Sequence, residues 1–320
     1  MHAELLAHHV DGAALAAVCD VDADAAGVVA RRLAVEAAGD ADELIGSADV
    51  DAVAICTSTD THIALIDAAA VAGKAIFCEK PIAHDLALVD RSLAAVESAG
   101  IPFMVGFNRR FDPAHRSVRD AVASGAVGDV HIVRITSRDP EPPPLAYARI
   151  SGGIFLDMTI HDFDMARYVT ASEVVEVVAQ GAVRIDPTFG EAGDVDTAVV
   201  MLVHESGVLT VIDNSRRSVY GYDQRVEAFG SEGLAASENG PVHTGVLRTA
   251  AGTSRPPLPH FFLERYRQSY LDEWDAFVAG VRGGTSPPVS GSDGRAALVV
   301  ALAAGRSLRE GRAVRVDEFR

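Results

Sequence analysis

The sequence predicts a doubly wound α/β domain over residues 1–105 and an α+β domain with a mostly antiparallel sheet over residues 106–320. Before residue 105, apolar runs of strand length alternate with alanine-rich helical stretches, which is the pattern of a parallel sheet covered by helices. After residue 106, strands of period 2 follow one another without intervening helices, as in an antiparallel sheet. With 320 residues and 48% hydrophobic content, the chain can fill two cores.

In the first region the predicted strands and helices alternate in chain order. The predicted strands are residues 14–19, 50–56, 74–78 and 102–105. The predicted helices are residues 24–37, 61–72 and 86–99. Because crossovers between parallel strands are right-handed, this order gives a Rossmann-type dinucleotide-binding domain with helices on both faces of the sheet.

The start of this domain departs from the pattern. A dinucleotide-binding fold opens with a strand and a G-x-G-x-x-G turn that leads into the first helix. No such motif precedes Asp20, and residues 1–9 look like the later part of that helix. We therefore expect an N-terminally incomplete domain whose missing first strand would leave its two neighbours about 9–10 Å apart. The upstream DNA is expected to encode the missing strand and turn.

Residues that follow the predicted strands are candidates for cofactor binding, because ligands of such sheets bind beyond the carboxyl ends of the strands. Asp20 and Val21 follow the first apolar run. The carboxylate of Asp20 can accept hydrogen bonds from an adenosine ribose and would repel a 2′-phosphate, which favours NAD over NADP.

A hydroxyl-rich turn follows the second predicted strand and opens a helix. Hydroxyl and backbone N–H groups there could meet the phosphate or ribose of a cofactor. Its candidate cofactor-binding residues are Thr57, Ser58, Thr59 and His62. The same turn also suits an ordinary helix start capped by Thr59 or Asp60.

The second region contains the strongest candidate for proton transfer. Gly152 and Gly153 form a turn before a predicted helix that carries Asp157 and His161 four residues apart, and hence on one face. An imidazole titrates near ~6.5, and a neighbouring carboxylate can orient it and stabilise its protonated form. The pair is predicted to be a general base with its orienting group. Alternatively, Asp157 caps the helix and His161 packs beneath it.

The remaining elements of the second region are strands, a proline-rich loop and C-terminal helices. The predicted strands are residues 130–137, 174–184, 197–204, 208–214, 225–230 and 246–250. Residues 138–144 contain too many prolines for a strand and are predicted to be a loop over the site. The helices 264–280 and 293–309 are expected to pack back on the first domain. The uncovered face of the sheet suggests a homo-oligomer, a dimer or a tetramer.

Composition excludes several classes of function. A net charge of −17 argues against nucleic acid or an anionic membrane as a partner, so a small molecule is expected. The N-terminus lacks the pattern of a signal peptide, and no apolar run approaches ~18 residues, so we expect a cytoplasmic protein. Cys19, Cys56 and Cys78 all fall in apolar runs and are predicted to be reduced, buried thiols.

Three motifs together carry a family resemblance. They are Cys78-Glu79-Lys80-Pro81 at a strand end, Gly106-Phe107-Asn108-Arg109-Arg110-Phe111 after the next strand, and Asp157-x-x-x-His161-Asp162 at the opening of a helix. In this order, over nearly the whole chain, they resemble the Gfo/Idh/MocA oxidoreductase family. The stretches 137–143, 157–168 and 220–225 resemble the inositol 2-dehydrogenases within it. The missing strand and glycine turn are the one large departure.

The resemblance implies a role for each catalytic residue. His161 would take the proton of a polyol hydroxyl while hydride leaves the same carbon for the nicotinamide of NAD. Lys80 would hold the substrate oxygen as negative charge develops on it, and would touch the cofactor together with Glu79. Asp157 would bond both a substrate hydroxyl and His161. Pro81 implies a rigid turn that can hold a cis bond. Without the motif, Lys80 would be an ordinary surface lysine.

The resemblance also implies polyol contacts from Arg110, Asp139 and Tyr220, because a ring of hydroxyls needs donors and acceptors around it. Arg109 and Tyr222 are near competitors for two of these places. The resulting interpretation is an NAD-dependent dehydrogenase of myo-inositol.

Two other interpretations stay open. The enzyme could act on another sugar or polyol, since fold alone does not decide the substrate. The chain could also be a polyol-binding protein that lacks its cofactor site. A metal hydrolase built on Asp157, His161 and Asp162 is disfavoured by the strand-end lysine and by the lack of further clustered ligands.

Overall fold

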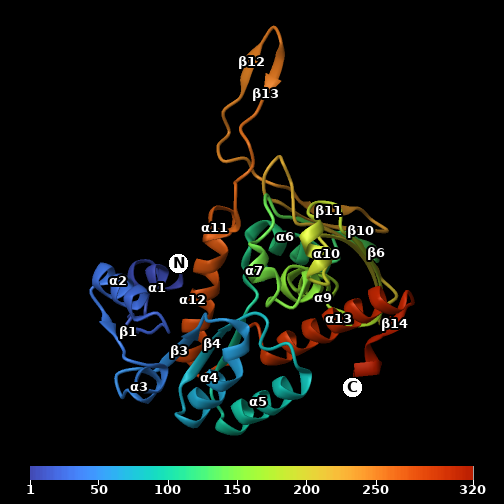
Figure 1. Cartoon of the computed structure of the whole chain (residues 1–320). Coiled ribbons are helices and arrows are strands. Elements are labelled where there is room, and N and C mark those ends of the chain that lie inside the picture. Colours follow the sequence, from blue (N-terminus) through green and yellow to red (C-terminus); the bar gives the residue numbers. More distant parts are fainter. Residues whose placement is uncertain (320) are drawn as a thin grey trace. The chain divides into compact units, whose positions relative to one another are not determined.

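The computed structural model describes residues 1–319 and divides into two compact units (Figure 1). The first unit combines Met1–Asn108 with Gln268–Ala296. The second unit combines Arg109–Arg267 with the segment from Ala297 onward. The sequence predicted one division near residue 105, whereas the segment Gln268–Ala296 returns to the first unit.

The first unit holds two parallel sheets and the helices between their strands. β1 (Ala17–Val18) pairs with β2 (Glu36–Ala37), and β4 (Ala75–Glu79) lies between β3 (Ala52–Ile55) and β5 (Phe103–Gly106). Among the described residues, β1 has no ladder to β3. The helices of this unit are α1 (His2–His8), α2 (Ala23–Leu33), α3 (Ala41–Gly46), α4 (Thr59–Val71), α5 (Leu86–Ala99) and most of α12 (Arg267–Gly283). The parallel α/β prediction is confirmed.

One predicted helix ends earlier than expected. The side chain of Asp22 accepts hydrogen bonds from the N–H groups of Asp24 and Ala25, which starts α2. Ala34 adopts a left-handed conformation with φ 55°, and this ends the helix. Residues 36–37, predicted to be helical, instead form β2. A left-handed C-terminal residue is usually glycine, so alanine gave no signal of this end.

The prediction of three buried thiols is only partly correct. Cys78 on β4 is buried, Cys19 is half-buried and Cys56, just after β3, is exposed. All three are free thiols. Cys56 belongs to the apolar run of the sequence, but β3 stops at Ile55, so Cys56 lies just beyond the strand.

The second unit is built on a seven-stranded sheet in the order β11-β10-β6-β9-β8-β7-β14. β6 and β9 pair in parallel and all the other neighbours are antiparallel, so the predicted mostly antiparallel sheet is confirmed. Its strands are β6 (Val130–Arg138), β7 (Val174–Ala182), β8 (Thr197–His204), β9 (Leu209–Ser215), β10 (Asp223–Gly230), β11 (Leu234–Ser237) and β14 (Val314–Arg315).

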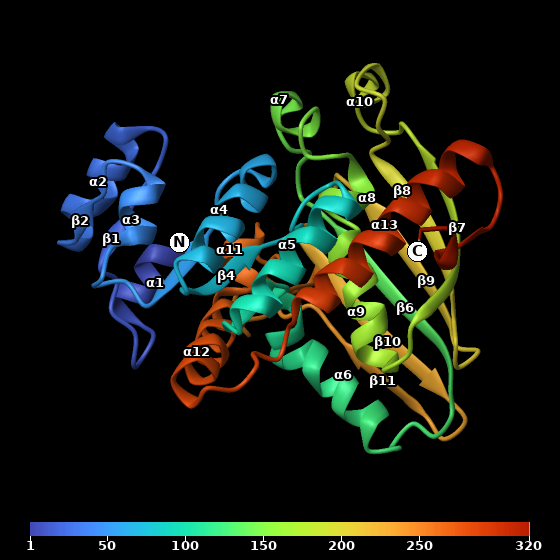
Figure 2. The same cartoon turned by 90° about the horizontal axis from the view of Figure 1, so that it is seen from below.

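Helices cover one face of this sheet. α6 (Pro113–Ala123), α9 (Ile160–Thr170) and the later part of α13 (Gly291–Glu310) lie along it (Figure 2). Strand residues that face these helices, such as Val133, Val177 and Val200, are fully buried. Because successive side chains of a strand alternate between faces, their neighbours point the other way.

The opposite face of the sheet carries exposed apolar side chains from strands β8, β9, β10 and β11. They are Val199, Met201, Leu209, Val211, Phe229 and Leu234, each between 38% and 53% exposed.

A separate hairpin, β12 (Leu247–Thr249) with β13 (Gly252–Ser254), extends away from the sheet (Figure 1). Short helices α7 (Leu145–Ala148), α8 (Ile154–Asp157), α10 (Pro187–Glu191) and α11 (Phe262–Arg265), and the 3-10 turns Asn108–Phe111 and Val316–Phe319, complete the described chain.

Within residues 1–319, no helix combines the length and the apolar character that a membrane crossing requires.

Candidate functional site

In the first unit, a buried histidine joins two of the loops at the carboxyl ends of the parallel strands. Nδ1 of His62 lies 2.9 Å from the carbonyl oxygen of Pro81, and Nε2 lies 3.1 Å from the carbonyl oxygen of Thr57. The Lys80–Pro81 peptide bond is cis, as the resemblance allowed. His62 therefore fixes the turn after β3 beside the turn that carries Lys80, and both of its ring nitrogens face protein carbonyls.

Glu79, the last residue of β4, has an ionic environment of its own. Oε1 lies 3.0 Å from Nε2 of His2, and Oε2 accepts a hydrogen bond from the N–H of Lys80 at 3.2 Å. Burial alone would raise the pKa of Glu79, but His2 and Lys80 lower it overall. A Cβ on Gly106 would lie 3.0 Å from Oε2 of Glu79, so the glycine leaves room for this carboxylate.

The other predicted cofactor-binding residues lie at strand ends of the same unit. Asp20 is exposed after β1, and its Oδ1 accepts a hydrogen bond from the N–H of Asp22 at 3.0 Å. Val21 is fully exposed. Ser58 is the N-cap residue of α4, so the alternative assignment of the cap to Thr59 or Asp60 is wrong.

In the second unit, the helix predicted to carry both Asp157 and His161 is interrupted between them. Asp157 ends α8, and His161 is the second residue of α9. The N–H of Thr159 bonds the carbonyl of Ile154 at 2.9 Å, five residues back, which widens the turn. The Thr159 hydroxyl donates to Oδ1 of Asn214 on β9 at 2.7 Å, which anchors the interruption to the sheet. The prediction of one continuous helix is therefore wrong.

Asp157 is held by side chains that the sequence did not single out. Its Oδ1 accepts a hydrogen bond from the hydroxyl of Tyr147 at 2.9 Å, and its Oδ2 accepts one from Nη1 of Arg216 at 3.1 Å. Tyr147 lies on α7, and Arg216 follows β9 directly. Neither residue belongs to a sequence motif that includes Asp157, so only the folded structure reveals this arrangement.

Arg109 and Asp162 form the buried centre of a polar network at the start of α9. Nη1 of Arg109 lies 2.6 Å from Oδ1 of Asp162. The Ser137 hydroxyl donates to the same oxygen at 2.5 Å, and Nδ2 of Asn214 donates to Oδ2 at 2.8 Å. Burial raises the pKa of Asp162, while Arg109 and these donors oppose the shift. The network ties α9 to strands β6 and β9.

Arg110, a predicted polyol contact, forms an ion pair with a carboxylate of its own unit. Its Nε and Nη2 donate to Oδ2 and Oδ1 of Asp164 at 2.8 and 2.6 Å. Its guanidinium carbon lies 5.3 Å from the centre of the Tyr168 ring. A bidentate pair of this kind fixes the guanidinium plane.

Asp139, in the loop after β6, is half-buried. Burial raises its pKa to about 6, with Asp157 and Asp162 adding to the rise and Arg109 and Arg216 opposing it. The structure thus brings two predicted site residues, Asp139 and Asp157, into one cluster of charges within the second unit.

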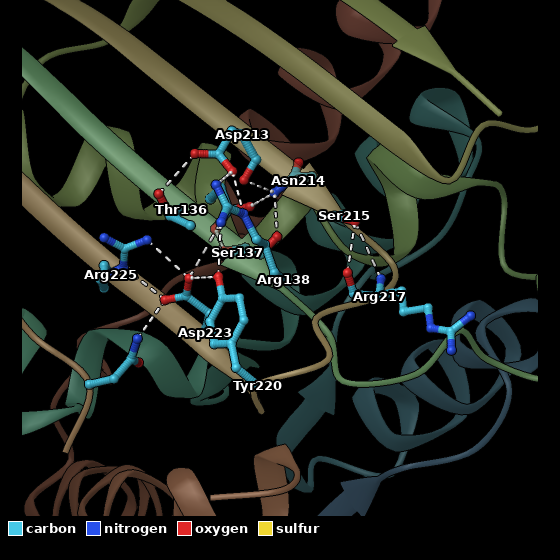
Figure 3. Close-up of polar contacts among 12 residues, drawn as sticks. Thr136, Ser137, Arg138, Asp213, Asn214, Ser215, Arg217, Tyr220, Asp223 and Arg225 are labelled. Atoms are coloured by element: carbon cyan, nitrogen blue, oxygen red, sulfur yellow. Dashed lines mark hydrogen bonds and ion pairs between the residues drawn. The ribbon is translucent and has the colours of Figure 1, made fainter. Parts of the chain in front are cut away.

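Tyr220, half exposed, belongs to a second polar network in which the structure also places Arg138 and Asp223 (Figure 3). The Tyr220 hydroxyl donates to Oδ2 of Asp223 at 2.6 Å and accepts from Nη1 of Arg138 at 2.9 Å. Arg138 also donates through Nε to Oδ1 of Asp213 at 2.8 Å. Tyr222, the alternative to Tyr220 as a polyol contact, is buried.

Comparison with known protein families gives a match in each of the two units. The family model for the oxidoreductase family with an NAD-binding Rossmann fold matches residues 1–107, and the model for the GFO/IDH/MocA C-terminal domain matches residues 115–236. The Rossmann-type prediction is thereby confirmed.

Individual relatives extend over almost the whole chain. The myo-inositol 2-dehydrogenase of Thermotoga maritima is 51% identical over 319 residues, which are 99% of this chain and 95% of that protein. The crystal structure of a probable dehydrogenase from Thermotoga maritima has a TM-score of 0.97 and 51% identity, with 99% and 95% coverage. The structure of scyllo-inositol dehydrogenase from Lactobacillus casei with bound NAD(H) and scyllo-inositol has a TM-score of 0.92 and 29% identity, with 99% and 94% coverage. The chain therefore belongs to the GFO/IDH/MocA family of oxidoreductases.

Proposed function

We propose that this protein is an NAD-dependent inositol 2-dehydrogenase, which oxidises the secondary hydroxyl at carbon 2 of myo-inositol to a ketone. The observation that carries the proposal is the 51% identity, over 99% of the chain, to a myo-inositol 2-dehydrogenase. The chain keeps Lys80, Asp157 and His161 at the positions that the family resemblance assigns to this chemistry.

The donor set of the first unit suits the adenosine ribose and the neighbouring part of NAD. Asp20 presents an exposed carboxylate after β1, where a ribose diol can donate to it. The start of α4 and the turn before it offer backbone N–H groups and the hydroxyls of Thr57, Ser58 and Thr59 to an anionic or ribose oxygen. Bound NAD supplies the acceptor for the hydride that leaves the substrate carbon.

The residues of this chain would perform the remaining chemistry. His161 takes the proton of the reacting hydroxyl, and Asp157 orients the imidazole and bonds a substrate hydroxyl. Lys80 holds the reacting oxygen while negative charge develops on it. Arg110, Asp139 and Tyr220 are proposed to contact other hydroxyls of the ring. Arg110 would do so while it stays paired with Asp164, so that its orientation is fixed in advance.

Steady-state kinetics on the purified chain tests the proposal. Formation of NADH from NAD, or of NADPH from NADP, is followed with myo-inositol, scyllo-inositol, glucose and glycerol. The proposal predicts the highest kcat/KM for myo-inositol with NAD. A higher value for another sugar would assign the enzyme to that substrate instead. If no substrate is turned over, calorimetric titration with myo-inositol and with NAD separately shows whether the chain binds only the polyol, which would contradict an enzymatic role.

We also propose that the protein acts as a homo-oligomer in the cytoplasm, in the breakdown of inositol. The exposed apolar face of the seven-stranded sheet supports an oligomer, because an apolar patch of this kind is uncommon on monomers. Replacing Val199 and Val211 by Asp should dissociate the assembly, as measured by light scattering coupled to size-exclusion chromatography. The matched control is Val219→Asp, which changes an exposed valine outside this sheet. An unchanged mass in the sheet variant would refute this interface.

A further inference from the structure

Arg216 is an arginine whose guanidinium lies almost entirely out of water, with a side chain 1% exposed. It is the first residue after β9, and its N–H donates to the carbonyl of Asp196 at 2.9 Å, which fixes its backbone. The guanidinium carbon lies 5.5 Å from the centre of the Phe189 ring. A buried charge is strongly unfavourable unless opposite charges compensate it, so the carboxylates around Arg216 indicate its role.

Two carboxylates lie on either side of this guanidinium. Nη1 donates to Oδ2 of Asp157 at 3.1 Å, and Nη2 lies 3.6 Å from Oδ2 of Asp194. Oδ1 of Asp194 in turn accepts a hydrogen bond at 3.0 Å from the N–H of Ile154, the first residue of α8. Arg216 thus contacts the last residue of α8 directly and the first through Asp194, which fixes both ends of the helix that presents Asp157.

The glycine before α8 is part of the same arrangement. Gly153 has φ +86°, and a Cβ at this position would lie 2.9 Å from Oδ1 of Asp194. A side chain there would displace Asp194 from the helix end and from Arg216. The glycine turn noted in the sequence therefore also makes room for the carboxylate that supports α8.

Charge also connects Arg216 with the loop after β6. The acidic groups that interact with it are Asp139, Asp157 and Asp194. Among the described residues, Nε and Nη2 of Arg216 donate no hydrogen bond. Its interaction with these carboxylates is therefore largely through charge, apart from the one hydrogen bond to Asp157.

We propose that Arg216 is a positioning residue for the oxidation reaction, whose buried guanidinium orients the carboxylate of Asp157 for its contacts with His161 and the substrate and balances the negative charge of the carboxylates around it. The inference rests on the proposed function. It assigns Arg216 no contact with the substrate or the cofactor. A merely structural arginine would support α8 without affecting the protonation of the site.

Kinetics of Arg216 variants as a function of pH separates these roles. In Arg216→Met, kcat for myo-inositol with NAD should fall by at least about tenfold. The acidic limb of the kcat/KM profile should move to higher pH, because the charge of Arg216 opposes the raised pKa of Asp139 and its loss lets that carboxyl keep its proton to higher pH. Arg216→Lys keeps the charge without the fork of N–H groups, so the limb should return towards the wild-type pH while kcat recovers only in part.

The neighbouring Arg217→Met is the matched control, because it removes the same charge from an exposed side chain one residue away. It should keep kcat and the pH profile of the wild type. Thermal unfolding of all four proteins identifies any variant that fails to fold, and Arg216→Lys then decides the outcome. A wild-type pH profile in folded Arg216→Met, or a wild-type kcat in Arg216→Lys, would overturn the inference while the proposed function stands. If the folded wild type and Arg217→Met turn over no polyol, both proposals fail.

Discussion

Nη1 of Arg109 lies 2.6 Å from Oδ1 of Asp162, and the two residues are 6% and 0% exposed. Asp162 directly follows His161 in the chain, in the first turn of α9. Its hydrogen bonds from Ser137 and Asn214 connect that turn to β6 and β9. The proposed base is thus placed by a helix whose start is fixed to the sheet through buried charges.

Asp162→Asn should destabilise the protein strongly, because it leaves the guanidinium of Arg109 buried without its counter-charge. Breaking one side of a buried pair lowers the free energy of unfolding by about 3–5 kcal/mol. Urea unfolding followed by circular dichroism measures the change. Glu205→Gln, at an exposed hairpin turn, is the control and should stay within about 0.5 kcal/mol of wild type. A loss below 1 kcal/mol in Asp162→Asn would contradict the importance given to this pair.

Much of the fold could be predicted from the sequence because strand and helix periodicity is local. The helix 86–99 was predicted with the bounds of α5, and the strand 197–204 with those of β8. The interruption between α8 and α9 could not be predicted, since it depends on Thr159 bonding Asn214, 55 residues away in the chain. β2 was missed because its two residues form a strand only by pairing with β1.

The candidate site could likewise be predicted from the sequence only in part. Motifs indicated Lys80, Asp157 and His161 as candidates, because the proposed chemistry requires particular side chains at particular strand and helix ends. Arg216 and Tyr147 carry no motif, and their role beside Asp157 follows only from tertiary contacts.

The choice of cofactor should depend on Asp20. Replacing Asp20 by Ser removes the charge that would repel a 2′-phosphate, so the ratio of kcat/KM for NADP to that for NAD should rise by at least about tenfold. Asp24→Ser, which removes an exposed carboxylate from the first turn of α2, is the control and should leave this ratio unchanged. Equal ratios in the wild type and Asp20→Ser would show that residue 20 does not set the preference.

Asp139 should make stability depend on pH in a defined direction. Burial raises its pKa to about 6 from 3.8, so the folded protein holds this proton more tightly than the unfolded chain. The stabilisation is fully present below about pH 4 and is lost as pH rises through about 6. Asp139→Asn should therefore gain stability relative to wild type between these values, on the order of 1 kcal/mol for a half-buried group.

Urea unfolding of wild type and Asp139→Asn at several pH values checks this sign. The control variant is Asp129→Asn, which changes an exposed carboxylate. If the difference between Asp139→Asn and wild type does not change with pH, the environment assigned to Asp139 is wrong.

Removing the groups that handle the proton and the developing charge should reduce turnover. His161→Ala and Lys80→Ala are each expected to lower kcat by at least about 10²-fold, the range for a positioned proton-transfer group. Steady-state kinetics with myo-inositol and NAD measures the loss. His131→Ala, which changes an exposed histidine on β6, should keep wild-type kcat. Near wild-type turnover in either site variant would remove that residue from the mechanism.

The most direct test of the proposed reaction uses myo-inositol that carries deuterium on carbon 2. The purified chain is incubated with this substrate and NAD, and the NADH formed is analysed by mass spectrometry. Hydride transfer from carbon 2 predicts that the NADH contains the deuterium and that the ketone product has lost it. NADH without deuterium, or a ketone product that retains the label at carbon 2, would contradict the proposed oxidation at carbon 2.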